Sequence, residues 1–292
     1  MDYKIIIIAT VVLGTIGLLS AVILYYIAKK FRVEEDPLID EVAELLPGAN
    51  CGGCGYPGCK GLAEAIVKAG SLDGLNCPAD GSSTMDNIAG LLGLTAEATE
   101  PKIAVLRCNG TCESAPAKSL YDSALSCAYA NTLFAGESGC QYGCLGCGDC
   151  VTVCQFDAIY MDPDTKLPTV IEEKCVACGA CVKACPRTLL ELRNKGKRGM
   201  RIYVACSNQE KGGVARKNCS VACIGCSKCV QVCPHDAITV NNFLAYIDFN
   251  KCKLCRKCAE VCPTGAIHEI NFPPRKPKQQ TEEVNSSNES LA

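Results

Sequence analysis

The chain has 292 residues, with 26 cysteines, 2 histidines, no tryptophan and a formal net charge of −2. This near-neutral balance excludes a protein that holds nucleic acid by electrostatic attraction. Two histidines leave little room for histidine-based catalysis or for Cys2His2 zinc fingers. The 48% hydrophobic content includes the cysteines and one N-terminal apolar run. The remaining apolar residues are therefore few, and we expect something besides apolar burial to hold the fold together.

The first predicted element is a membrane anchor at residues 1–28. Residues 5–28 carry no charge, and as a helix they would span roughly 36 Å, enough to cross a hydrocarbon core of about 30 Å. A cleaved signal peptide is the alternative, but its apolar part is shorter and a small-residue cleavage site would follow. Because Lys29, Lys30 and Arg32 follow the run, we predict a single pass through the cytoplasmic membrane, with the C-terminal part in the cytoplasm.

Next comes a small domain, predicted over residues 34–94, with a short helix from Pro37. The string CGGCGYPGC, closed by a later Cys-Pro, has the spacing C-x2-C-x4-C-x17-C. Its glycines allow a tight loop. A helix predicted over 62–69 then leads the chain back to the later cysteine of this set. A cytoplasmic location keeps thiols reduced, so we expect metal ligands and not disulfides. A structural zinc knot is the alternative to the [4Fe–4S] cluster that we predict on Cys51, Cys54, Cys59 and Cys77.

Residues 79–101 read as a polar joint with one apolar turn. An adaptor segment is predicted over 102–139, with a strand at IAVL (103–106) and a helix near 123–133. We expect this segment to pack against the module that follows it and to hold no site of its own.

The strongest signal is the motif C-x2-C-x2-C-x3-C, which occurs four times after residue 140. In bacterial two-cluster ferredoxins this run binds [4Fe–4S] clusters, and its fourth cysteine ligates the other cluster. We expect that fourth cysteine to open a helix. Zinc more naturally uses two separated C-x2-C pairs. The crossed rule therefore predicts four clusters, on Cys144, Cys147, Cys150 and Cys185; on Cys175, Cys178, Cys181 and Cys154; on Cys223, Cys226, Cys229 and Cys262; and on Cys252, Cys255, Cys258 and Cys233.

The four motifs belong to two copies of one unit. Cys144 and Cys223 are 79 positions apart, and the same offset relates Cys140 to Cys219. Hairpins are predicted between the paired motifs, with turns at 162–166 and at Asn241–Asn242. We therefore predict an α+β fold with two tandem ferredoxin-like modules, at 140–195 and 202–271, and a disordered tail at 272–292.

Six cysteines lie outside these five predicted sets. The sequence allows a sixth cluster on Cys108, Cys112, Cys127 and Cys140, although their spacing fits no known motif. It favours buried free thiols that behave as small hydrophobic residues. Cys108 and Cys206 lie within similar strings, AVLRCNG and IYVACSN, so they are expected to be equivalent positions of the repeat.

Several motifs are absent from the sequence. It has no G-x-G-x-x-G after a strand, no P-loop, no nucleophile elbow and no H-E-x-x-H. We therefore expect no NAD, flavin or ion-pumping site on this chain, and we expect it to transfer single electrons.

The anchor, then CGGCGYPGC, then CQYGCLGCGDCV and KCVACGACVKACPR resemble the B subunit of the Rnf complex, a membrane-bound, ion-translocating ferredoxin:NAD oxidoreductase. The resemblance covers roughly residues 1–195, and residues 206–270 are similar to the longer, polyferredoxin forms. One departure is Gln155, where many ferredoxin motifs have proline; it bears on the local backbone more than on ligation.

The resemblance implies an electron-transfer subunit of a translocase-type enzyme. Such a subunit takes electrons from soluble reduced ferredoxin and passes them to other membrane and peripheral subunits, which reduce NAD and move Na⁺ or H⁺. The alternative is a membrane-tethered polyferredoxin that serves another membrane reductase or a redox-sensor reducing system.

Overall fold

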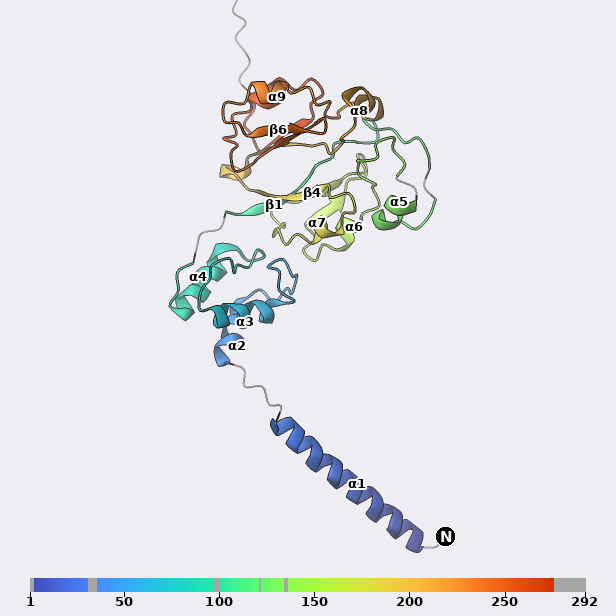
Figure 1. The fold of residues 1–292 in the computed structure, drawn as a ribbon, viewed down its shortest axis with the longest axis vertical. Coiled ribbons are helices and arrows are strands. Elements are labelled where there is room, and N and C mark those ends of the chain that lie inside the picture. Colours follow the sequence, from blue (N-terminus) through green and yellow to red (C-terminus); the bar gives the residue numbers. More distant parts are fainter. Residues whose placement is uncertain (1–2, 31–35, 97–99, 121, 134–135, 276–292) are drawn as a thin grey trace, which may run out of the picture.

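The computed structural model describes residues 3–30, 36–96, 100–120, 122–133 and 136–275. Within these ranges a long N-terminal helix stands apart from a body of short helices and two-stranded antiparallel sheets (Figure 1). This arrangement confirms the predicted α+β class with one N-terminal apolar helix. Most of the tail that we predict to be disordered lies outside the described residues.

Helix α1 (Tyr3–Lys30) is the only described helix that is long and apolar enough to cross a membrane. Its segment Thr10–Lys30 has a mean hydropathy of 2.2, and none of that segment is buried against the rest of the protein. Lys29 and Lys30 occupy its last turn. A helix that exposes so much apolar surface to water would be unstable, so its apolar faces fit a lipid environment.

Helices α2 (Pro37–Leu45), α3 (Cys59–Ala69) and α4 (Gly81–Leu92) form one small unit around a shared apolar core. The predicted helix from Pro37 is confirmed: Asp36 caps it, and its side chain accepts a hydrogen bond from the Leu38 N–H at 3.0 Å.

Helix α4 replaces the polar joint expected from the sequence, and that expectation was wrong. Serine, threonine, asparagine and glycine weaken its helix propensity, but Met85, Ile88 and Ala89 fall on one side of it and are buried. Packing of this face in the apolar core that α4 shares with α2 and α3 therefore outweighs the local preference.

Each ferredoxin-like module has one sheet that joins its ends and one hairpin between its two motifs. In the first module Ala104 of β1 pairs with Leu192 of β4, and in the second Tyr203 of β5 pairs with His268 of β8. The first module consists of β1 (Lys102–Leu106), α5 (Cys127–Leu133), α6 (Asp149–Thr152), β2 (Ile159–Met161), β3 (Pro168–Val170), α7 (Ala180–Ala184) and β4 (Leu190–Asn194). The second consists of β5 (Arg201–Val204), α8 (Gly212–Asn218), α9 (Lys228–Gln231), β6 (Ile238–Asn241), β7 (Leu244–Ile247), α10 (Lys257–Glu260) and β8 (Ile267–Ile270), after a short 3₁₀ turn at Lys197–Gly199.

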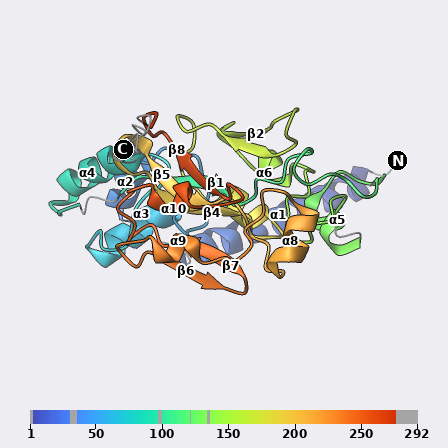
Figure 2. The same ribbon diagram turned by 90° about the horizontal axis from the view of Figure 1, so that it is seen from above.

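Both predicted hairpins are present, and the second turns one residue later than expected. Asn241 pairs with Leu244, so Asn242 and Phe243 form the two-residue turn. Their φ angles are 47° and 58°, the left-handed values that such a turn requires. From above, the β2–β3 and β6–β7 hairpins lie on opposite sides of the two sheets that join the module ends (Figure 2).

The two modules meet across a buried guanidinium. Arg193 on β4 is 1% exposed, and its Cζ lies 5.7 Å from the ring centre of Tyr203 and 5.2 Å from that of Tyr246. Glu191 of the first module forms an ion pair with Arg193, so the charge is compensated within its own strand. A cation enclosed by aromatic rings of the other module favours one relative placement of the two.

A second link between the modules involves Glu172, which follows β3. Its carboxylate accepts a hydrogen bond from Arg201 of β5 at 2.7 Å and one from Asn271 at 3.0 Å. The hydrogen bond from Arg201 is the main reason why the pKa of Glu172 lies below its usual value.

We expect Glu172→Gln to lower the stability of the folded chain at pH 7 by about 1 kcal/mol or less, because the pair is partly open to solvent. A depressed pKa means that the stabilisation is fully present above the unfolded-state pKa of about 4.3 and is lost as the pH falls through the lower folded value. The difference in melting temperature between the unmodified chain and Glu172→Gln should therefore stay constant between about pH 8 and pH 5.5. A difference that shrinks within this range would contradict the depressed pKa.

Candidate iron–sulfur sites

Each ferredoxin motif folds as a loop. The residues immediately before and after its second cysteine have a left-handed backbone conformation. Glycine adopts that conformation without strain, but a side chain there is disfavoured. The same geometry recurs where the residue is not glycine, so the spacing of the cysteines, and not glycine alone, defines the loop. The eight residues are Gly146 and Gly148, Ala177 and Gly179, Gly225 and Ser227, and Leu254 and Arg256, with φ from 54° to 87°.

The first three cysteines of a motif point toward a cavity. The last cysteine of the other motif in the same module points into that cavity as well. Three of the four predicted crossed sets each line one cavity completely. They are Cys154 with Cys175, Cys178 and Cys181; Cys262 with Cys223, Cys226 and Cys229; and Cys233 with Cys252, Cys255 and Cys258.

The remaining crossed set is only partly together. Cys144, Cys150 and Cys185 line one cavity, but the fourth cysteine there is Cys127. Cys147 lies beside Cys127. Burial raises the pKa of the Cys147 thiol, and the charge of Cys127 and a hydrogen bond between the two side chains raise it further. Nothing in the sequence indicates that Cys127 lies near this site, because no spacing rule relates it to the motif.

Helix α5 brings Cys127 to this position by docking on α6. Ser126 donates a hydrogen bond through Oγ to Asp149 Oδ2 at 3.0 Å, and the Ala128 N–H donates to the same oxygen at 3.2 Å. Asp149 therefore serves as a helix cap supplied from a distant part of the chain.

The fourth cysteine of each motif does not open a helix, and that expectation was wrong. The short helices contain the third cysteine, and Cys154 and Cys185 follow their ends. The Ala158 N–H donates to Cys154 Sγ and the Leu189 N–H to Cys185 Sγ, both at 3.4 Å. A turn that points a backbone N–H at a sulfur atom provides a donor that stabilises a thiolate there.

The predicted set near the membrane is built on the loop before α3. The Asn50 side chain accepts the Cys59 N–H at 2.8 Å, which fixes the start of α3 at a cysteine. Cys77 is buried, burial raises the pKa of its thiol, and Cys51 and Cys59 are near enough to raise it further. Cys54 packs against the same core as Cys59 and Cys77.

Burial also governs the thiols of the ferredoxin motifs. It raises the pKa of Cys150 and of Cys258 to about 12, and that of Cys181 and of Cys229 to about 11. Neighbouring cysteines raise these pKa values further, because a second thiolate would be repelled by the first. A thiolate at any of these four positions is therefore stable only with a compensating cation, and soft iron in a [4Fe–4S] cluster fits an all-sulfur site with backbone donors.

The other set considered from the sequence, Cys108, Cys112, Cys127 and Cys140, is not brought together. Cys127 lies at the first motif, and Cys112 is exposed, with its Sγ 3.8 Å from the Thr165 carbonyl oxygen. Among the described residues, no group of three Cys, His, Asp or Glu side chains is arranged as a single-ion site.

Comparison with protein families assigns iron–sulfur domains to the same parts of the chain. A 4Fe-4S dicluster domain matches residues 143–189 and 222–266, and a second family of that description matches 174–237. A family described as a putative Fe-S cluster matches 46–79. These findings show that the chain carries [4Fe–4S] clusters.

Among curated proteins, the chain is similar to the B subunit of the Na(+)-translocating ferredoxin:NAD(+) oxidoreductase complex of Acetobacterium woodii, with 45% identity over 83% of this chain and 71% of the relative. It is 42% identical to the B subunit of the proton-translocating ferredoxin:NAD(+) oxidoreductase complex of Clostridium ljungdahlii, over 83% of this chain and 84% of the relative. It is 40% identical to the B subunit of the ion-translocating oxidoreductase complex of Methanosarcina acetivorans, over 82% and 89% of the two chains.

We expect Gly225→Ala to remove the cluster at the third motif, because an added Cβ would lie 2.7 Å from the Phe243 carbonyl oxygen and 2.8 Å from its Cα. Iron and acid-labile sulfide should each fall by about four per chain. Gly213→Ala in α8 is the control, since its Cβ would have open space. Unchanged iron in Gly225→Ala would show that the hairpin can shift to accept the methyl group.

Proposed function

Because this chain belongs to the B-subunit family of ion-translocating oxidoreductase complexes, its [4Fe–4S] sites relay electrons, and we propose that it receives them from reduced ferredoxin. It passes them to other membrane and peripheral subunits, which reduce NAD and move Na⁺ or H⁺. The whole complex is then a translocase-type ferredoxin:NAD oxidoreductase. The names of two relatives give different ions, which is in keeping with an ion path that lies on the partner subunits.

The observation that carries this proposal is that neighbouring sites are in direct contact. The backbone of Gly53, in the loop near the membrane, packs so closely on Cys178 that a Cβ on Gly53 would lie 2.8 Å from the Cys178 Cα. Cys51 is near enough to raise the pKa of Cys178. Within the first module, Cys181 of one set is near enough to raise the pKa of Cys150 of the other, beyond the effect of burial. The three sites therefore form a row that begins at the unit next to α1.

The second module repeats this contact. Cys258 of one set lies near Cys229 of the other, and the charge on Cys229 raises the pKa of Cys258. Within each module, cysteines of the two sets therefore lie close together, and such proximity favours transfer of single electrons between the sites.

We assign five clusters to this chain, and each cluster supplies a centre that gains and loses one electron. The residues of the chain provide the thiolates, the N–H donors to sulfur and the apolar walls that keep water away. The ligands are Cys51, Cys54, Cys59 and Cys77; Cys144, Cys147, Cys150 and Cys185; Cys154, Cys175, Cys178 and Cys181; Cys223, Cys226, Cys229 and Cys262; and Cys233, Cys252, Cys255 and Cys258.

Helix α1 anchors this row to the cytoplasmic membrane. Lys29 and Lys30 at its C-terminal end support a cytoplasmic location for the iron–sulfur region, by the positive-inside tendency. Soluble ferredoxin reaches the clusters from that side.

Crossed ligation can be tested by counting iron. Cys154→Ser and Cys181→Ser should each remove about four iron atoms, and the double variant should lose no more than either one, because both cysteines belong to one cluster. Cys150→Ser combined with Cys154→Ser should instead lose about eight. If the pair from one motif loses only four, each motif holds its own cluster and the crossed assignment fails.

The electron donor can be tested on the purified full-length chain in detergent, kept free of oxygen. Reduced ferredoxin should bleach the visible absorbance of the clusters, whereas NADH alone should leave it unchanged, because the sequence offers no site for hydride transfer. In membranes, deletion of this chain should abolish ferredoxin-dependent NAD reduction, and the full-length chain should restore it. Direct bleaching by NADH, or ferredoxin-dependent NAD reduction that survives the deletion, would contradict the proposal.

A further inference from the structure

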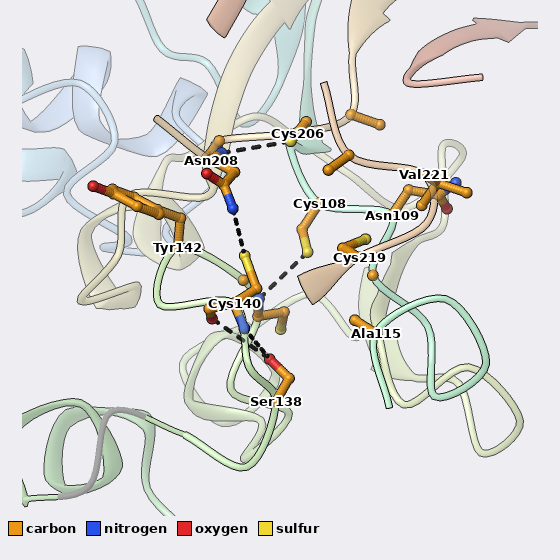
Figure 3. A pocket seen from close by; sticks show the side chains of 16 residues that line it. Cys108, Asn109, Ala115, Ser138, Cys140, Tyr142, Cys206, Asn208, Cys219 and Val221 are labelled. Carbon is orange, nitrogen blue, oxygen red and sulfur yellow. Dashed lines mark hydrogen bonds between the residues drawn. The ribbon is translucent and has the colours of Figure 1, made fainter. Parts of the chain in front are cut away.

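Four of the six cysteines outside the predicted sets line one cavity at the junction of the two modules. They are Cys108, Cys140, Cys206 and Cys219 (Figure 3). The last three are buried. Cys108 is close enough to Cys140 and Cys219 for their charges to act on it, and Cys219 is affected in the same way by Cys206 and Cys140. All four thiols are free.

These four cysteines are two equivalent pairs, one from each copy of the repeat. Cys108 stands two residues after β1, and Cys206 stands two residues after β5. Cys140 and Cys219 each stand four residues before the first cysteine of a ferredoxin motif. Because the copies face each other, equivalent positions converge on the junction, as expected of a site shared by a repeated unit.

The sulfur atoms receive hydrogen bonds of the kind that stabilise cluster ligands. The Cys144 N–H donates to Cys108 Sγ at 3.3 Å, and the Asn208 Nδ2 donates to Cys140 Sγ, also at 3.3 Å (Figure 3). The Asn208 backbone N–H points at Cys206 Sγ at 3.5 Å. Asn208 is only 1% exposed, and a neutral thiol is a weak partner for a buried carboxamide. Thiolate ligands account for this buried donor better than free thiols do.

The cavity is as large as those of the predicted clusters. Counting the space open at its mouth, it encloses about 400 Å³, against about 370, 390, 360 and 300 Å³ for the four cavities of the ferredoxin motifs. Small residues make this room. A Cβ on Gly110 would lie 3.6 Å from Cys108 Sγ and 3.7 Å from Cys219 Sγ, and Ala115 and Ala222 also face the cavity.

We propose that Cys108, Cys140, Cys206 and Cys219 bind a sixth [4Fe–4S] cluster, held jointly by the two modules. The set consists of soft sulfur ligands only, it has backbone and side-chain donors to sulfur, and its cavity matches in size those that carry the ferredoxin spacing.

This site lies between the row of three proposed sites that begins next to α1 and the two proposed sites of the second module, and its role in electron transfer rests on the proposed function. Cys144, a proposed ligand in the first module, donates its N–H to Cys108. Cys223, a proposed ligand in the second, donates its N–H to Cys206. An electron that enters the sixth cluster from one side leaves by the other. One neighbour is oxidised as the next is reduced, and no bond is made or broken.

The test is the iron, acid-labile sulfide and zinc content of the full-length chain, purified without oxygen in detergent. The unmodified chain should hold about 24 iron and 24 sulfide, and Cys206→Ser and Cys219→Ser should each hold about 20 of both. Cys112→Ser is the matched control and should keep about 24, since Cys112 is exposed and lies outside the cavity.

The outcomes separate this proposal from the proposed function. About 20 iron in the unmodified chain, unchanged by Cys206→Ser, would show free thiols and overturn the sixth cluster alone. One zinc that is lost in the variants would show a zinc site and also overturn it. A chain without iron would overturn the proposed function itself.

A second variant keeps all four cysteines, so it is informative even if the serine variants fold poorly. Asn208→Ala should leave the iron content unchanged but lower the reduction potential of one cluster, because a sulfur atom loses a hydrogen-bond donor. Redox titration followed by electron paramagnetic resonance measures this shift. Asn218→Ala is the control, since Asn218 contacts the same Glu210 as Asn208 but no sulfur atom. Identical potentials in Asn208→Ala and the unmodified chain would contradict the proposal.

Discussion

A cysteine thiolate that leaves water must find a cation, and this requirement governs the architecture. Burial raises the pKa of Cys150, Cys181, Cys229 and Cys258 to about 11 or 12, so the protein alone favours neutral thiols at these positions. Iron reverses that preference, because binding exchanges the thiol protons for strong metal–sulfur bonds. Cysteines of the motifs belong to the buried core of both modules, so clusters bound to them are part of what holds the modules together.

The two motifs of a module exchange their fourth cysteines. The need to compensate buried thiolates therefore affects the whole module and not only the loops. Cys154 and Cys185 each leave their own motif and face the cavity of the partner motif. The segments that follow them become the strands β2 and β4, so the placement of these cysteines and the placement of the strands are coupled. The backbone N–H groups of Ala158 and Leu189, which point at these sulfur atoms, mark the turns at which this happens. A module therefore cannot open at one site without disturbing the other.

The junction of the modules combines charge with sulfur. Arg193 lies among aromatic rings of the second module, and Glu172 holds Arg201 across the same boundary. These contacts fix how the two copies of the repeat face each other. That placement gathers two pairs of cysteines that are distant in sequence, and the sixth cluster that we propose there would join the electron paths of the two modules.

The sequence alone determined the features that depend on local spacing. The distances between cysteines within a motif dictate the loop, because its two left-handed residues flank the middle cysteine whether they are glycine or not. The apolar run of α1 and the hairpins between motifs are equally local, and the alternation of motifs and hairpins implied the α+β class. The resemblance to the B-subunit family also rests on short strings.

Tertiary structure decided what local patterns do not encode. Helix α4 forms because Ile88 is buried in the core that it shares with α2 and α3, despite weak helix propensity. Cys127 joins the first motif because Asp149 caps α5. Cys108 lies beside Cys219, and not with Cys112, because β1 and β5 belong to sheets of facing modules. These contacts join residues that are tens of positions apart in the sequence. Their free energies come from packing and from hydrogen bonds between distant segments, and the order of residues within one short segment does not reveal them.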